Sequence, residues 1–322
     1  MQSVITTINH VWAQKRLRQL LQIGWFTLIG VFIVLAIATS WDSIRALEWT
    51  PNRLISLAIA LVVTLMRKFT GAIRWAWIIQ LLGKEKMSFI QSLRVFFISG
   101  LAAWLPGTYW FIPGRILMNT KQGVTSLQTS VSILLEQFLM IISGGLMAIF
   151  AFDLVADVTK VPVQSFWWVL LIIAAGLVAI HPRVIHFCTN LMAKVLRMQP
   201  VAIELGYGMM LALLLWSVVV WVLSGMSLLF LTQVFVPEIG VQQTGVFTAI
   251  FAFSFLVGYF TPFAPNGLGV REGIMGLALG ALGVPAGLIV IIAALSRLLV
   301  IFEDVFWAAF SSLVFRQSYP SS

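Results

Sequence analysis

Long apolar runs recur along this chain, from Leu20 to the C-terminal region. Each extends over about 18 residues or more, enough for a helix to cross the roughly 30 Å hydrocarbon core of a bilayer. Charged residues make up 10% of the sequence, well below the level of about 25% in soluble domains. Tryptophans such as Trp41 and Trp49 stand near the ends of the runs, as do Trp104 and Trp110, a placement typical of interfacial aromatic belts. The sequence therefore predicts an all-α polytopic integral membrane protein.

The net charge of +9 does not indicate a nucleic-acid-binding protein, because the basic residues are spread along the loops. A nucleic-acid surface would need them gathered on one soluble face. One cysteine, Cys188, excludes an internal disulfide, and three scattered histidines provide no metal-ligand spacing. We expect no cofactor, no metal site and no nucleic-acid partner.

The loop charges predict how the chain is oriented in the cell membrane. Basic residues before the first run (Lys15, Arg16 and Arg18) and the basic region 67–94 indicate cytoplasmic segments. The regions 151–164 and 233–243 carry acids and at most one cation, so they are expected outside. Both termini are predicted to be cytoplasmic. The first run, residues 20–38, exceeds the 7–15 residues of the apolar region of a secretory signal peptide, so we expect a retained span; the alternative is cleavage after 36–38.

Two segments combine apolar sequence with helix-breaking residues. The first is LPGTYWFIPGR, residues 105–115, and the second is TPFAPNGLGVRE, residues 261–272. Proline lacks a backbone N–H and disrupts a helix, and irregular backbone at membrane depth requires burial in protein or contact with water. The residues predicted to break the helices are Pro106, Gly107, Pro113, Gly114, Pro262, Pro265, Gly267 and Gly269.

The predicted orientation requires the apolar segment 95–112 to enter and leave on one side, with 127–150 as a true span. A second re-entrant hairpin, entering from outside, would include 243–260 and the second break. With these hairpins the protein has about seven to nine membrane segments. We treat 1–322 as one membrane domain whose halves, 1–160 and 161–322, form two inverted repeats, a design known in transporters; chance similarity is the alternative.

Arg271 and Glu272 follow the second break directly and are candidate substrate-binding residues. A charge in hydrocarbon costs about 2.5–3.5 kcal/mol on insertion scales, so it normally faces a bundle interior or a watery cavity. A guanidinium suits a lipid phosphate. The structural alternative is an Arg271–Glu272 ion pair that only holds the broken helix together.

Further candidates are Arg115, Glu136 and Arg297. Glu136 lies within an apolar span and needs a cation partner or else holds a proton; Arg115, Arg271 and Arg297 are the available cations, and its role could be functional or structural. Glu303 and Asp304 are expected to be solvated near a membrane surface. The alternative is that Arg297 and Asp304, seven positions apart on one helix face, offer both charges to a polar cavity. Arg67 and Lys68 are expected to extend to the cytoplasmic interface.

The sequence resembles the membrane region of lysylphosphatidylglycerol synthases and their stand-alone relatives. The first-half residues that carry the resemblance are Arg74-Trp75, Pro106-Gly107, Gly114-Arg115 and Glu136; those of the second half are Pro262, Pro265, Gly267, Gly269, Arg271, Glu272, Gly283-Val284-Pro285 and Arg297. The family pattern usually has an arginine at the position of Gln137. An ion pair that this arginine forms in the family is therefore not expected in this chain. In bifunctional members a separate soluble domain transfers the amino acid. Because the last apolar segment nearly reaches the C-terminus, we expect no such domain here.

What the resemblance implies is a transporter-like protein that translocates or handles an anionic or glycosylated lipid, without synthase activity. The alternative is a non-transporting lipid-binding partner of a membrane enzyme. An intramembrane enzyme is disfavoured, because the sequence offers no nucleophile–base pair or metal cluster.

Overall fold

The computed structural model describes residues 47–83, 87–105, 109–149, 167–196, 206–261 and 267–314, together with isolated positions between 24 and 45. Every regular element in these residues is a helix, which confirms the predicted all-α membrane class. Several predicted features lie outside the described residues: most of the first span, the acidic region 151–164, and the break residues Pro106, Gly107, Pro262 and Pro265.

Five described segments are long and apolar enough to cross a membrane. They correspond to α4 (Pro51–Gly83), α7 (Ser126–Ala148), α11 (Tyr207–Phe235), α12 (Thr244–Tyr259, preceded by the short helix η4, Val241–Gln243) and α14 (Ala286–Val314). Shorter helices are α5 (Phe89–Gly100), η1 (Leu101–Trp104), α6 (Phe111–Thr120), α9 (Trp167–Ala179), α10 (Pro182–Leu196) and α13 (Val270–Ala281). The long helices α4 and α11 pack along one another and form the centre of the bundle.

Both predicted breaks separate helices that fold back on each other. In the first, α5 and α6 have 12 and 10 residues and are in contact. At about 1.5 Å per residue, neither spans a bilayer. In the second, α12 contacts the 12-residue α13. The chain therefore forms two helical hairpins, α5–α6 and α12–α13. The prediction that Pro113 and Gly114 break a helix is wrong, because both lie in α6. Pro113 is the third residue of this helix, where a backbone N–H has no intrahelical partner, so a proline is tolerated.

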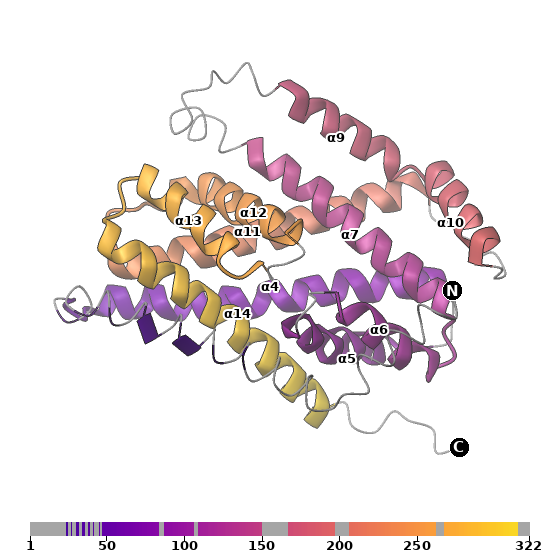
Figure 1. Ribbon diagram of the computed structural model, residues 1–322, viewed down its shortest axis with the longest axis horizontal. Helices are drawn as coiled ribbons and strands as arrows, with labels where there is room; N and C mark the ends of the chain where they lie inside the picture. The colour runs from indigo at the N-terminus through magenta and orange to yellow at the C-terminus, as the bar shows by residue number, and fades with distance from the viewer. Residues whose placement is uncertain are drawn as a thin grey trace.

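The two hairpins lie beside different halves of α4. Figure 1 shows α5 and α6 near the C-terminal half of this helix, whereas α13 lies toward its N-terminal end. Side-chain contacts agree, since Phe96 of α5 contacts Trp75, and Ala60 belongs to the same core cluster as Phe247 of α12. Helices α9 and α10 lie at the edge of the bundle beyond α7 (Figure 1).

The second arm of each hairpin ends in the same backbone motif. The N–H of Val124 donates to the carbonyl of Asn119, and the N–H of Val284 donates to that of Leu279, both over 3.1 Å. The preceding glycines, Gly123 and Gly283, have φ of 80° and 81°. This is the Schellman cap, which uses a left-handed residue to satisfy the last helical carbonyls.

Trp104 was predicted to stand in an interfacial belt, and this prediction is wrong. Its side chain is 7% exposed and its indole N–H donates to the carboxylate of Asp304 over 2.8 Å. A buried indole needs a hydrogen-bond acceptor, and a tertiary contact between η1 and α14 provides one. Trp41 and Trp49 are exposed, as interfacial residues are.

Candidate functional site

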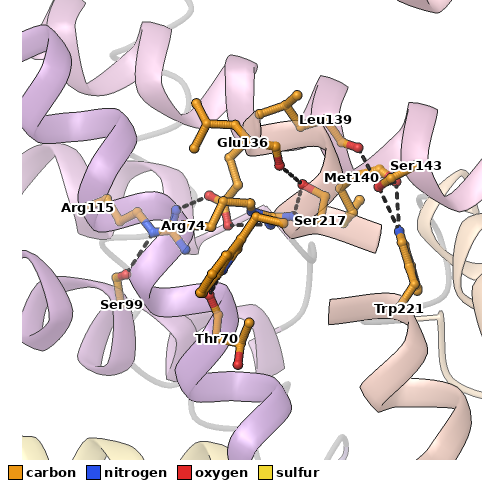
Figure 2. A network of polar contacts seen from close by, with 12 residues as sticks. Thr70, Arg74, Ser99, Arg115, Glu136, Leu139, Met140, Ser143, Ser217 and Trp221 are labelled. Atoms are coloured by element: carbon orange, nitrogen blue, oxygen red, sulfur yellow. Dashed lines mark hydrogen bonds and ion pairs between the residues drawn. The ribbon is translucent and has the colours of Figure 1, made fainter. Parts of the chain in front are cut away.

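The first polar cluster surrounds Glu136, in the middle of α7. Arg115 of α6 forms an ion pair with its Oε2, and Arg74 of α4 lies 3.5 Å from its Oε1. Figure 2 shows both guanidiniums pointing at this one carboxylate. All three side chains are at most 6% exposed. Of the three cations predicted as possible partners of Glu136, Arg115 pairs with it in the structure, and Arg74 is a second partner that was not predicted.

Hydroxyls and aromatic rings complete this cluster. Ser217 of α11 accepts a hydrogen bond from Arg74, and Ser99 of α5 accepts one from Arg115 (Figure 2). The Arg115 guanidinium carbon also lies 4.5–5.2 Å from the ring centroids of Trp75, Phe96 and Phe111, within the distance of cation–π attraction. Arg115 is thus held on every side by protein.

A second cluster surrounds Glu272, in the first turn of α13. One carboxylate oxygen lies 3.5 Å from Nε of Arg297 on α14, and the other accepts the backbone N–H of Gly269 over 2.7 Å. Glu272 therefore closes the start of α13 in the manner of a helix N-terminal cap and joins that helix to α14. The predicted alternative, an Arg271–Glu272 ion pair across the break, is wrong, because the carboxylate is directed to Arg297 and Gly269.

The acids of α14 were predicted to be solvated, and this prediction is wrong. Glu303 and Asp304 are 1% and 6% exposed. Arg67 of α4 pairs with Glu303, and Lys68 lies 2.5 Å from a carboxylate oxygen of Asp304. The prediction that these two cations extend to the interface is also wrong. Their position next to the acids depends on how α4 crosses α14, which local sequence does not reveal.

Arg271 differs from the other buried arginines. It is 6% exposed, and its guanidinium makes no ion pair or hydrogen bond with any described residue. Its contacts are the ring faces of Phe255 and Phe251, at 4.6 and 5.5 Å. The same Phe251 ring faces Arg67 at 5.6 Å. Arg271, in the first turn of α13, is thus a buried cation with no ion-pair partner among the described residues.

Glycines allow Arg271 to occupy this place. A Cβ on Gly267 would lie 2.9 Å from the Cα of Gly258 and 2.8 Å from Cδ of Arg271. Gly267 also has φ of 69°, which favours glycine. The close approach of these two glycines places the Arg271 side chain against α12.

The two hairpins carry related ion pairs of opposite polarity. In the first half, the cation Arg115 lies on the second hairpin arm and the acid Glu136 on the following span. In the second half, the acid Glu272 lies on the arm and the cation Arg297 on the span. Each hairpin is therefore fixed to its following helix by one buried charge pair.

The hairpins also meet each other. The hydroxyl of Tyr109, at the start of α6, donates to the carbonyl of Tyr259 at the end of α12 over 3.1 Å, and the two rings are 5.8 Å apart. Phe96 lies between the clusters, since its ring faces both Lys68 and Arg115. The structure thus places the five predicted binding residues in two adjacent clusters, Arg115 and Glu136 in one, and Arg271, Glu272 and Arg297 in the other.

Within the described part of the chain, no group of histidine, cysteine and acidic residues has the arrangement of a metal site. The charged residues of this region that were not among the predicted binding residues are Arg67, Lys68, Arg74, Glu303 and Asp304. The sequence contained one signal for two of them, since Arg67 and Arg74 are seven positions apart and so lie on one face of α4.

Interrupted apolar helices with buried, paired charges define an integral membrane protein with polar sites inside its bundle. A comparison with known protein families matches residues 19–303 to the family described as the lysylphosphatidylglycerol synthase TM region. The chain belongs to this family, as its motifs predicted. A search of curated proteins found no match to it.

Proposed function

We propose that the protein translocates an anionic or glycosylated phospholipid across the bilayer, and that Arg271 binds the lipid phosphate. The two hairpins act as re-entrant elements that allow a head group to reach the interior of the bundle. Family membership supports a role connected with membrane lipids. The geometry of Arg271 makes the proposal specific.

The observation that carries the proposal is a buried guanidinium without an acidic partner among the described residues. In the second cluster Arg67, Lys68, Arg271 and Arg297 face three acids, Glu272, Glu303 and Asp304, which leaves one cation in excess. A phosphate would neutralise it through charge-assisted, bidentate hydrogen bonds. The first cluster also has one cation in excess, because Arg74 and Arg115 share Glu136. It offers less to a phosphate, because Arg115 is already enclosed by Glu136, Ser99 and three aromatic rings and Arg74 donates to Ser217.

The test measures movement of fluorescent phosphatidylglycerol in phosphatidylcholine vesicles containing the purified protein, with dithionite quenching of the outer leaflet. Arg271→Gln should slow the movement about tenfold or more, because a hydrogen bond to a charged group contributes about 1.5–3 kcal/mol. Arg271→Lys retains the charge but not the planar fork, so it should retain part of the rate. Unchanged movement in Arg271→Gln would overturn the assignment.

Arg183→Gln is the matched control, since Arg183 is an exposed arginine of α10. It should leave the rate unaltered. The same vesicles address the alternative of a lipid-binding partner without transport. In that case wild-type protein would bind phosphatidylglycerol, Arg271→Gln would lose this binding, and neither protein would exchange lipid between leaflets.

A further inference from the structure

A groove runs along the outside of the second hairpin, between α13 and α14. Its volume is about 570 Å³. Glycines of α13 (Gly269, Gly273, Gly276 and Gly280) form one side, and Ile289 and Ala293 of α14 form the other. Two of the lining residues, Leu277 and Val290, are 68% and 40% exposed. The groove is therefore apolar and open at the surface of the helical bundle.

The glycines have two different roles in this groove. A Cβ on Gly276 would lie 3.0 Å from Ile289, so this glycine allows the two helices to pack closely. A Cβ on Gly273 would meet nothing within 4 Å. Close packing of α13 on α14 accordingly does not need a glycine at position 273, where the missing side chain leaves space in the groove.

The length of the groove matches one lipid tail. Gly269 and Gly280 are 11 positions apart, which corresponds to about 16 Å along a helix. One leaflet contributes about half of the roughly 30 Å hydrocarbon core.

One end of the groove, lined by Gly269 and Glu272, lies at the second break. Glu272 is its one acidic lining residue and pairs with Arg297. Arg271 precedes Glu272 in the chain, and its side chain lies against α12 and does not line the groove. A ligand that fills the groove would thus have an apolar tail along α13 and a charged group beside the second break. This is the chemistry of a phospholipid.

We propose that the α13–α14 groove binds an acyl chain of the transported lipid while its head group occupies the second cluster. This inference rests on the proposed function and adds the path of the tail. The groove allows the chain to remain in an apolar environment when the phosphate reaches Arg271. Lipid tails are as apolar as the groove, so the gain comes from packing and not from the hydrophobic effect.

The experiment compares two anionic probes, dioleoyl- and dihexanoyl-phosphatidylglycerol, by titration calorimetry with the purified protein in detergent. Gly273→Leu places a side chain in open groove space, and leucine is the better helix former. We expect it to weaken binding of the dioleoyl lipid about tenfold, because a filled groove excludes the tail. Binding of the six-carbon probe, whose chains reach only part of the groove, should change less than twofold. Gly273→Ala should give an intermediate loss for the long lipid and serves as the variant least able to disturb folding.

Gly145→Leu on α7 is the matched control, since a Cβ there also meets nothing within 4 Å and Gly145 does not line the groove. Equal affinities in Gly273→Leu and Gly145→Leu would overturn the acyl-chain site. If Gly273→Leu converts a dimer to a monomer in light scattering, the groove binds a second copy of the chain, which also overturns it. Arg271→Gln should weaken both probes. If Arg271→Gln changes the affinity of neither probe while Gly273→Leu weakens binding of the dioleoyl lipid, the acyl-chain site is supported and the phosphate site at Arg271 is overturned.

Discussion

At the scale of residues, buried charge is compensated in three different ways. Glu136 is shared by two arginines, Glu272 pairs with Arg297 and accepts a backbone N–H, and the Arg271 guanidinium faces two aromatic rings with no ion-pair partner among the described residues. The sequence identifies each of these residues as exceptional, because ionisable groups are rare in apolar segments. It does not identify their partners, which come from helices far away in the chain.

We predict that Glu136→Gln destabilises the protein by about 3–5 kcal/mol, because removing the shared acid leaves two buried guanidiniums uncompensated. Thermal unfolding in detergent measures the effect. Glu238→Gln, at an exposed acid, should leave the midpoint unchanged. Equal midpoints for the two variants would show that the first cluster does not stabilise the fold.

At the scale of elements, proline and glycine predicted where the hairpins are, but not what makes their contact possible. The prolines and glycines in TPFAPNGLGVRE indicate a break, whereas the approach of Gly267 to Gly258 is visible only once α12 and α13 are folded together. The Schellman caps after Thr120 and Ala281 show the same division. Their Gly-Val pairs are local sequence signals, and the equivalence of their hydrogen bonds is a property of the fold.

Gly267→Ala should destabilise the second hairpin by about 1–2 kcal/mol from its positive φ alone, and by more from the clash with Gly258. Thermal unfolding monitored by tryptophan fluorescence measures the change. Gly145→Ala, which introduces a methyl group into open space on α7, should be neutral or slightly stabilising. A Gly267→Ala protein as stable as this control would contradict the role of the glycine contact.

At the scale of the whole molecule, we propose that the two halves are inverted repeats whose hairpins enter from opposite sides. The support is the placement of the hairpins along different halves of α4 (Figure 1), the matching caps, and the ion pairs of opposite polarity. Tyr109 and Tyr259 join the hairpins where they meet.

Cysteine labelling tests this topology in a Cys188→Ser background, which removes the one native thiol. Lys121→Cys lies after the first hairpin and Ala281→Cys after the second, both at exposed positions. A membrane-impermeant maleimide added to intact cells should label Ala281→Cys and not Lys121→Cys, and should label both after permeabilisation. Labelling of Lys121→Cys in intact cells would contradict a hairpin that enters from the cytoplasmic side.

The sequence by itself determined the membrane class, the helical content, the family and the regions in which the two hairpins form. These depend on local properties: apolar run length, the missing N–H of proline, and charges too costly to leave in lipid. Tertiary structure alone decided which charges meet. Arg67, Lys68, Glu303 and Asp304 were predicted at the membrane surface and instead pair inside the bundle, because the crossing of α4 and α14 brings together residues more than 200 positions apart in the sequence.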